Sequence, residues 1–335
     1  MKATALICDE NQKFSLEDVV LKNPGPDQVA IRTHYTGVSI GTEFGIIRGK
    51  VSNSYPLSTG YQGTGVIEAV GSDIEDFEVG DDVYFRHNDS MELLDGTSVM
   101  CASGAHCSHV VTRPHTTHGV AKMVPGAPMD VACMYVMPAV GLYGVDMANP
   151  RMGQTVVVYG TGQIGLSVVA ACAHRGCVII AVDLSDTQLA IARKMGADYV
   201  INGSSQDVEA EVKKVAPEGA DVVFESTGIP ENVDPAISLC RPHGSFVWQG
   251  NYGDAPISMH FLPAHHRRVR MFFPCDDGFQ PCRRAVVKNM AMGALPWEHC
   301  ITHRIDYTES PEMFSMINRG DRKDIVGVVM KLAGP

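Results

Sequence analysis

The chain has 335 residues, of which 45% are hydrophobic, so it is long enough to form two domains with apolar cores. It carries 27 basic and 38 acidic residues, which gives a formal net charge of −11. This acidic balance argues against nucleic acids and anionic membrane surfaces as partners.

The start of the chain and its cysteines favour a soluble, cytoplasmic protein. Met1 to Cys8 has the composition of a strand rather than of a signal peptide, and no apolar run approaches the roughly 18 residues of a membrane span. The ten cysteines form no C-x-x-C pair, which favours reduced thiols. Cys101 and Cys107 lie near His106 and His109, but this spacing fits no standard zinc module, and we expect no metal there.

From Lys2 to about Lys122 the sequence predicts short strands separated by turn residues. The segments with strand composition are KATALI, VAIRTHYTGVSI, GTGVIEAVG, DDVYF and HCSHVVT. This part is therefore expected to be β-rich, without a long helix. Residues 130–149 have a different character, because their spaced apolar residues suit one or two helices. We expect a domain boundary near this segment.

The next stretch contains three glycines at G-x-G-x-x-G spacing, between a β-branched run and a second apolar run. The first glycine allows a tight turn, the second lets the backbone approach a pyrophosphate, and the third lets helix and strand pack closely. The phosphates would lie at the start of a helix, where unpaired N–H groups favour negative charge. The predicted cofactor-binding residues of this loop are Gly160, Thr161, Gly162, Gln163, Ile164 and Gly165.

An acidic residue after the second apolar run indicates which dinucleotide binds. Asp183 follows Gly165 by eighteen residues, about where a carboxylate accepts hydrogen bonds from the adenosine ribose hydroxyls. A 2′-phosphate would be repelled there, so the predicted cofactor is NAD rather than NADP. Thr227 and Gly228 stand at the end of a later strand, where the adjoining loop would run past the cofactor.

After Asp183 the chain alternates between helix and strand. The order is DTQLAIARKMG (helix), ADYVIN (strand), SSQDVEAEVKKVAP (helix), ADVVFESTG (strand), VDPAISLCRPHG (helix) and SFVWQGNYG (strand). This alternation predicts βαβ units and a parallel, doubly wound sheet. After RVRMFFP we expect helices at PCRRAVVKNMAMGA and SPEMFSMINRG and a closing strand at IVGVVMKL. A basic cluster from His265 to Arg270 is either a solvated strand edge, a subunit contact or an anionic site.

The whole chain resembles the medium-chain dehydrogenase/reductase superfamily, which includes the zinc alcohol and polyol dehydrogenases. The likeness is carried by TGVSIGTE, STGYQGTGVIEAVG with FEVGDDVYF, GTGQIG with IIAVD, RKMGADYVIN, DVVFESTG and GVVMKL. It implies an α/β fold with a GroES-like β-rich catalytic domain at 1–140 and 275–335 and a doubly wound, parallel-sheet Rossmann domain at 141–274. It also implies a nicotinamide in the cleft between the domains and a homodimer or homotetramer.

The zinc ligands of that superfamily are replaced in this sequence. The resemblance places Ile40, then Tyr61 and Gln62, then Met137, where zinc members carry a cysteine, a histidine with a glutamate, and a further cysteine or acid. Isoleucine cannot bind zinc, and the other three side chains are poor ligands for it. The cysteine-rich lobe of the structural zinc is also missing, since only Cys101 occurs there. We therefore expect no metal.

Other side chains must then handle the proton that zinc makes easy to lose. Thr42 matches the family position whose hydroxyl contacts the substrate oxygen. Tyr61 stands at the place of the histidine ligand, and a phenol with its pKa lowered near the nicotinamide would act as general acid or base. Glu43 and Gln62 would orient these groups or the substrate. A buried structural phenol bonded to Gln62 is the alternative for Tyr61.

A few further residues are weaker candidates for the site. Asp276 and Asp277 would either reach a polyhydroxylated substrate or form a turn with the glycine that follows them. Some histidines of the β-rich part would shuttle protons if they enter the cleft, and would otherwise be structural. These histidines are His34, His87, His106 and His109.

The sequence thus predicts an NAD-dependent, zinc-independent dehydrogenase that transfers hydride between a secondary alcohol and the nicotinamide. A sugar or polyol substrate is favoured, because the polar side chains at the expected site suit several hydroxyl groups. Two alternatives stay open. One is a zinc-free enone or quinone reductase, against which Asp183 counts because such members commonly use NADPH. The other is a dinucleotide-binding protein without catalysis.

Overall fold

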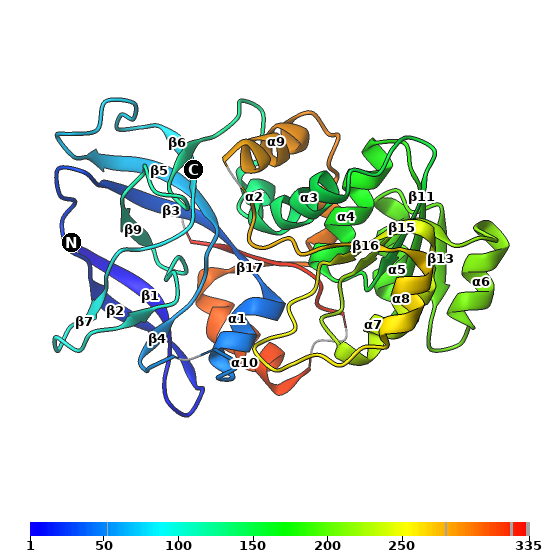
Figure 1. Ribbon diagram of the computed structural model, residues 1–335. Coiled ribbons are helices and arrows are strands. Elements are labelled where there is room, and N and C mark those ends of the chain that lie inside the picture. Colours follow the sequence, from blue (N-terminus) through cyan, green and yellow to red (C-terminus); the bar gives the residue numbers. More distant parts are fainter. Residues whose placement is uncertain (52, 279, 322–323, 333–335) are drawn as a thin grey trace. The chain divides into compact units, whose positions relative to one another are not determined.

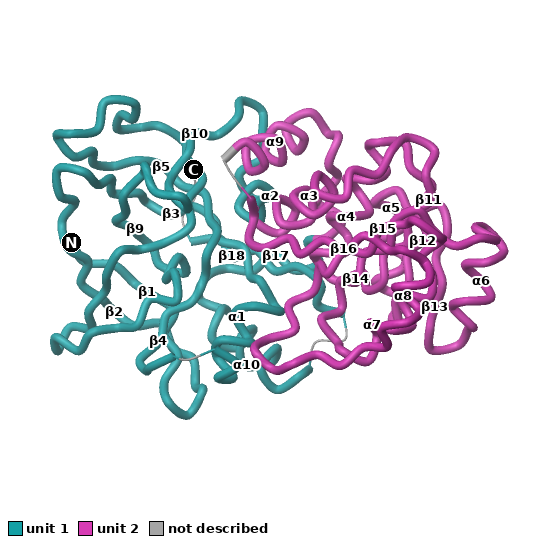
Figure 2. The backbone as a smooth tube through the Cα atoms, in the orientation of Figure 1, with its two compact units in different colours: residues 1–135, 301–335 teal, residues 136–300 magenta. Residues whose placement is uncertain are grey.

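The structure is a computed structural model that describes residues 1–51, 53–278, 280–321 and 324–332. The chain forms two compact units, drawn in different colours in Figure 2: unit 1 is residues 1–135 and 301–335, and unit 2 is residues 136–300. Residues 275–300 were expected with the first domain but belong to unit 2. The reason is that helix α9 (Gln280–Ala291) packs against helix α3 (Val136–Ala148) of that unit.

Unit 1 is built mainly of strands, as predicted (Figure 1). One sheet has the order β7-β2-β1-β4-β8, and the other has the order β10-β6-β5-β3-β18-β17, with β9 also paired to β3. The strands are β1 (Lys2–Cys8), β2 (Phe14–Val20), β3 (Val29–Val38), β4 (Leu57–Ser58), β5 (Gly63–Val70), β6 (Asp82–Phe85), β7 (Glu92–Leu93), β8 (Met100–Cys101), β9 (His109–Thr112), β10 (Ala121–Lys122), β17 (His303–Asp306) and β18 (Val328–Lys331).

A helix that the sequence analysis did not predict follows β3 directly. This helix, α1 (Ile40–Ile47), buries Ile40, Glu43, Phe44 and Ile47, which is the one-faced spacing of an amphipathic helix. The other helical segments of unit 1 are α2 (Met129–Ala132), η3 (Tyr307–Glu309) and α10 (Ser310–Arg319). The prediction missed α1 because the helix is short and contains two glycines, so its helical hydrophobic period is weak. The segment before it also has the composition of a strand.

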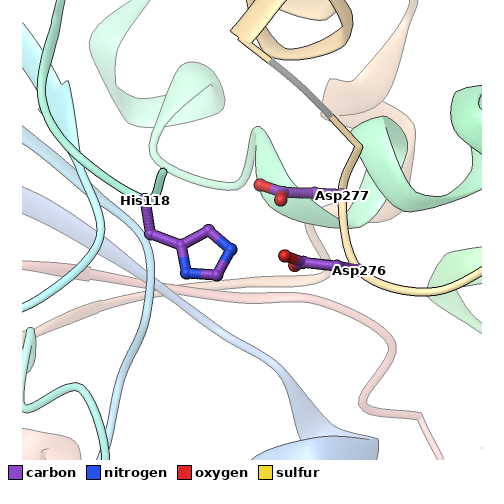
Figure 3. A group of neighbouring side chains, drawn as sticks. All are labelled: His118, Asp276 and Asp277. Carbon is purple, nitrogen blue, oxygen red and sulfur yellow. The ribbon is translucent and has the colours of Figure 1, made fainter. Parts of the chain in front are cut away.

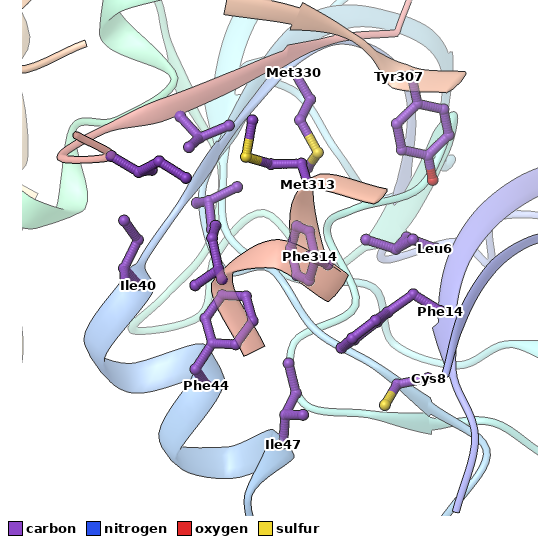
Figure 4. Close-up of a cluster of buried hydrophobic side chains, with 14 of the residues drawn as sticks. Leu6, Cys8, Phe14, Ile40, Phe44, Ile47, Tyr307, Met313, Phe314 and Met330 are labelled. Carbon is purple, nitrogen blue, oxygen red and sulfur yellow. The ribbon is translucent and has the colours of Figure 1, made fainter. Parts of the chain in front are cut away.

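An apolar cluster holds α1 against the last helix of the chain (Figure 4). The Phe314 ring of α10 lies 5.2 Å from the Phe44 ring of α1 and 5.5 Å from the Phe14 ring of β2, centroid to centroid. Leu6 and Ile47 are buried in the same cluster. Burial of such side chains stabilises a fold by about 1.5–3 kcal/mol each, so the start of α1 is anchored by segments from both ends of the sequence.

Unit 2 contains a parallel sheet with the strand order β13-β12-β11-β14-β15-β16. The order reverses beside β11, because β12 and β13 extend the sheet on one side of β11 and β14 to β16 on the other. The predicted doubly wound parallel sheet is therefore confirmed. The strands are β11 (Thr155–Tyr159), β12 (Val178–Asp183), β13 (Tyr199–Asn202), β14 (Ala220–Glu225), β15 (Cys240–Trp248) and β16 (Arg270–Phe272).

The remaining helical segments of unit 2 are α4 (Gln163–His174), α5 (Asp186–Lys194), α6 (Val208–Val215), η1 (Pro230–Asn232), α7 (Val233–Ser238), α8 (Phe261–Arg267) and η2 (Trp297–Cys300). Two predictions differ here. The helix expected through residue 244 ends at Ser238, and β15 begins at Cys240; Pro242 cannot continue a helix. The basic cluster also divides between two elements instead of forming one strand edge. His265 to Arg267 form the last turn of α8, where positive charge suits the helix dipole, and Arg270 begins β16 at the edge of the sheet.

Among the residues that the structure describes, every helix is too short or too polar to cross a lipid bilayer.

Candidate functional site

The glycine loop of unit 2 connects β11 to α4, and each of its glycines has a distinct geometry. Gly160 has a φ of 93°, and a Cβ there would lie 2.7 Å from Cγ2 of Thr227. A Cβ on Gly165 would lie 1.9 Å from the carbonyl oxygen of Gly160. Around Gly162, the residue that caps α4, a Cβ would meet no atom within 4 Å. The loop therefore turns at the first glycine, packs closely at the third, and is open at the second.

Asp183, the last residue of β12, is held beside this loop by four hydrogen bonds. Its Oδ2 accepts from the backbone N–H and the hydroxyl of Thr161, at 2.7 and 2.9 Å. Its Oδ1 accepts from the N–H groups of Leu184 and Ser185, at 2.8 and 3.0 Å. These bonds fix a negative charge at the carboxyl edge of the sheet. The predicted contact of Asp183 with a ribose stays a prediction.

A buried glutamate that the sequence analysis did not single out shapes the neighbouring turn. Glu225 ends β14, is fully buried, and accepts hydrogen bonds from the N–H groups of Thr227 and Gly228, at 3.0 and 3.3 Å. The hydroxyls of Thr227 and Tyr252 also donate to it. Burial and this carboxylate raise the pKa of Tyr252. Glu225 thus holds Thr227 against Gly160. The available signal was an acidic residue that directly follows the apolar run Val222–Phe224 of this strand.

In unit 1, the predicted residues Thr42 and Tyr61 come together at the start of α1. The side chains of Thr42 and of Ser39, which precedes α1, hydrogen-bond the Tyr61 phenol. The guanidinium carbon of Arg86 lies 5.3 Å from the centroid of the Tyr61 ring, which is a cation–π distance. Thr42 is exposed and Tyr61 is buried. Ser39 and Arg86 were missed, because they lie near Tyr61 only in the folded chain.

Burial extends the pH range over which this phenol stays protonated. It raises the pKa of Tyr61 to about 12; the bonds from Ser39 and Thr42 and the charge of Arg86 act in the opposite direction, while Glu43 adds to the rise. We expected a lowered pKa near a nicotinamide, but in the chain by itself desolvation is the largest effect. Tyr61 is therefore protonated at neutral pH and is a hydrogen-bond donor.

The other two predicted catalytic residues are buried and hold the backbone. Glu43 is 0% exposed and bonds to the N–H of Ser39, the hydroxyl of Thr59 and the ring of His106. The amide nitrogen of Gln62 donates to the carbonyl oxygen of Gly37 at 3.3 Å. Both side chains support the segments around Tyr61.

The weaker candidates divide by environment. Asp277 forms a fully buried, two-bond ion pair with Arg283 of α9, with both N···O distances 2.7 Å, so a structural role explains it. Figure 3 shows it next to Asp276, which is exposed. His87 bonds to the Thr112 hydroxyl, and His109 to that of Ser108. His34 and His106 are buried.

Comparison with known proteins agrees with this architecture. Residues 25–138 match the family described as alcohol dehydrogenase GroES-like domain, and residues 164–291 match the zinc-binding dehydrogenase family. An alcohol dehydrogenase of Cupriavidus necator is 27% identical over 340 residues, covering 91% of each chain. The chain belongs to the zinc-type medium-chain dehydrogenase/reductase superfamily.

Solved structures of other proteins show the same fold. The 2R,3R-butanediol dehydrogenase of Bacillus subtilis superposes with a TM-score of 0.85 at 21% identity, covering 99% of this chain and 100% of that one. Galactitol-1-phosphate dehydrogenase of Escherichia coli also gives 0.85, at 18% identity, covering 98% and 100%. The predicted fold of this medium-chain dehydrogenase/reductase, a GroES-like part and a Rossmann part, is confirmed.

Zinc is the metal that this superfamily implies, and the side chains at the expected ligand positions do not fit it. Ile40 is 7% exposed, packs in the apolar cluster of unit 1 and offers no donor atom. Tyr61 keeps its proton because its pKa is about 12, and the amide nitrogen of Gln62 donates to a carbonyl. Met137 is a buried thioether in α3. Zinc in proteins is held by thiolates, imidazoles and carboxylates.

Proposed function

We propose that this protein is an NAD-dependent oxidoreductase that interconverts a secondary alcohol and its ketone without zinc, with a sugar or polyol as substrate. The observation that carries the proposal is the buried Tyr61 hydroxyl, bonded to Ser39 and Thr42. Tyr61 stands at the sequence position where the resemblance expects a zinc ligand. Relatives described as alcohol, butanediol and galactitol-1-phosphate dehydrogenases support oxidoreduction at hydroxyl groups. The carboxylate of Asp183 at the glycine loop supports NAD, since it would repel a 2′-phosphate.

The residues of unit 1 handle the proton in this proposal. A bound nicotinamide supplies or accepts the hydride. In the reductive direction, Tyr61 Oη gives its proton to the carbonyl oxygen as the alcohol forms, and in the oxidative direction the phenolate takes that proton back. Hydrogen bonds from Ser39 and Thr42 stabilise the phenolate, and so does the charge of Arg86. Thr42 is exposed, so it can pass the proton to water.

We also propose that the partners are small molecules rather than nucleic acids or membranes, which the net charge of −11 supports. A homodimer or homotetramer is proposed, supported by β16 at the edge of its sheet, where another strand can pair. The cytoplasm is the proposed location, and a sequence with ten cysteines but no C-x-x-C pair supports a reducing compartment.

The test begins with metal analysis of the purified protein and a search for NADH formation over a panel of polyols, sugars and secondary alcohols. Tyr61→Phe is then compared with Tyr55→Phe, which removes another phenol of the same unit, one whose hydroxyl donates to the backbone oxygen of Ile47 at 2.9 Å. We expect Tyr61→Phe to lower kcat by about 10²- to 10⁴-fold, the usual contribution of a general acid or base. Tyr55→Phe should stay near the wild-type rate.

Turnover within about twofold of wild type in Tyr61→Phe would remove the proposed role of the phenol, because a general acid contributes far more. Tightly bound zinc that activity requires would overturn zinc independence. Reduction of enones with a preference for NADPH would support the reductase alternative. NAD binding without turnover of any compound in the panel would support a non-catalytic protein.

A further inference from the structure

Unit 1 contains a buried pair of titratable side chains, Glu43 of α1 and His106, that the proposed mechanism does not use. The His106 Nε2 lies 2.8 Å from Oε2 of Glu43, and both side chains are almost completely excluded from solvent, at 0% and 1% exposure. The other ring nitrogen, Nδ1, lies 3.0 Å from the hydroxyl of Thr36 in β3. Since a carboxylate only accepts hydrogen bonds, Nε2–H is the donor to Glu43.

Glu43 connects the two segments that carry the phenol and its partner. Its Oε1 accepts from the backbone N–H of Ser39 at 2.8 Å, and its Oε2 accepts from the hydroxyl of Thr59 at 2.9 Å. The Ser39 side chain bonds to the Tyr61 phenol, and Thr59 lies two residues before Tyr61. One carboxylate therefore sets the spacing between the start of α1 and the segment of Tyr61.

His106 in turn fixes that segment from the other side. A Cβ on Gly60 would lie 2.6 Å from Cγ of the His106 ring, so only glycine permits this close packing. The backbone N–H of His106 donates to the carbonyl oxygen of Thr59 at 3.2 Å. The Phe314 ring of the cluster in Figure 4 meets the imidazole edge-on, with centroids 5.5 Å apart.

We propose that Glu43 and His106 are positioning residues, which together hold the Ser39 hydroxyl and the Tyr61 phenol in the geometry for proton transfer. Neither side chain touches the substrate. This inference rests on the proposed function, in which Tyr61 carries the proton. The reason is geometric. The side-chain hydrogen bonds of the pair described above reach the segment of Ser39, the segment of Thr59 and Tyr61, and Thr36 of β3. It assigns Glu43 a supporting role in place of direct catalysis.

The experiment compares His106→Leu, His106→Gln and His34→Leu in the full chain, using the panel compound with the highest wild-type turnover. Glutamine can both donate to Glu43 and bond to Thr36, so it should rescue what leucine loses. His34 is the control, because it is 3% exposed in the same unit and neither ring nitrogen has a hydrogen-bond partner among the described residues. The proton-shuttle role considered for His34 from the sequence is therefore dropped, since no hydrogen bond connects its ring to a relay among the described residues. We expect kcat to fall by about 10²-fold in His106→Leu, the cost of roughly 1 Å of misplacement.

The KM for NAD should stay within about twofold in all three variants, because only the proton-handling geometry is disturbed. His106→Gln should keep kcat within about threefold, and His34→Leu should match the wild type. The crystal structure of His106→Leu provides a readout that needs no substrate, and it should show the Tyr61–Ser39 hydrogen bond broken. If His106→Leu does not fold, Glu43→Gln is measured in the same way.

A wild-type kcat in His106→Leu, or an unchanged Tyr61–Ser39 bond in its crystal structure, would overturn the inference. Different results would overturn the proposed function. These are wild-type turnover in Tyr61→Phe, or a wild-type protein that turns over no compound of the panel. If Tyr61→Phe is inactive and His106→Leu keeps the wild-type kcat, the pair of Glu43 and His106 has only a structural role.

Discussion

The two units build their candidate sites in different ways. In unit 2 the glycine loop depends on backbone geometry, since the carboxylates of Asp183 and Glu225 accept hydrogen bonds from backbone N–H groups. All of these donors lie within two residues of the carboxylate except Thr161, which precedes Asp183 by 22 residues. In unit 1 the phenol of Tyr61 depends on side chains from distant segments, among them Ser39 and Arg86. A local backbone site leaves a motif in the sequence, and a site assembled from distant side chains does not.

The largest effect is expected for an alanine substitution at Gly165, and a substitution at Gly162 of the same loop is the comparison. Gly165→Ala places a Cβ 1.9 Å from the Gly160 carbonyl oxygen, so backbone must move. Overpacking of this kind costs about 1–3 kcal/mol or more, which exceeds the gain of about 1 kcal/mol that alanine brings inside a helix. We expect a lower free energy of unfolding in urea and a loss of NADH binding, measured by fluorescence titration.

Gly162→Ala is the matched variant, because its φ of −63° suits alanine and its surroundings are open. Its stability should change by about 1 kcal/mol or less, the effect of alanine at a helix cap. NADH binding should still weaken by about tenfold or more, since the added methyl group would occupy the space that the proposal assigns to the pyrophosphate. Unchanged NADH affinity in Gly162→Ala would show that the phosphates do not approach this residue.

The same contrast explains how much the sequence predicted. The spacing of Gly160, Gly162 and Gly165 predicted a strand, a turn and a helix correctly, because each step involves near neighbours in the chain. The sequence analysis missed α1 and the pairing of Glu43 with His106. Residues 43 and 106 are 63 positions apart in the chain, and hydrophobic periodicity contains no information about such a contact. His106 was considered as a proton shuttle, but its partners could not be named.

An intermediate effect is expected at Asp183, the residue that links the loop to the choice of cofactor. Asp183→Ser removes a carboxylate that accepts from both groups of Thr161. We expect the ratio of kcat/KM for NAD over NADP to fall by about 10- to 100-fold, since a hydrogen bond to a charged group contributes about 1.5–3 kcal/mol. Asp186→Ser, at the exposed first turn of α5, is the control and should leave that ratio unchanged. An unchanged ratio of kcat/KM for NAD over NADP in Asp183→Ser would show that Asp183 does not determine the cofactor preference.

The smallest effects concern the Tyr61 phenol and the Arg86 charge that lies beside its ring in unit 1. Because the pKa of Tyr61 is about 12, ketone reduction at saturating NADH should keep a constant kcat between about pH 6 and pH 9. A histidine acid, with its usual pKa of about 6.5, would instead lose activity about tenfold for each pH unit above that value.

Arg86→Met removes the positive charge beside the Tyr61 ring, and kcat for reduction should still be independent of pH between about pH 6 and pH 9. Arg86 favours the phenolate that forms when Tyr61 gives up its proton, and a cation–π contact contributes about 0.5–2 kcal/mol. The kcat for reduction should therefore fall by roughly 2- to 30-fold, and Arg86→Lys, which keeps the charge, should recover part of it. Equal rates in Arg86→Met and wild type would mean that the hydroxyls of Ser39 and Thr42 stabilise the phenolate without help from a cation.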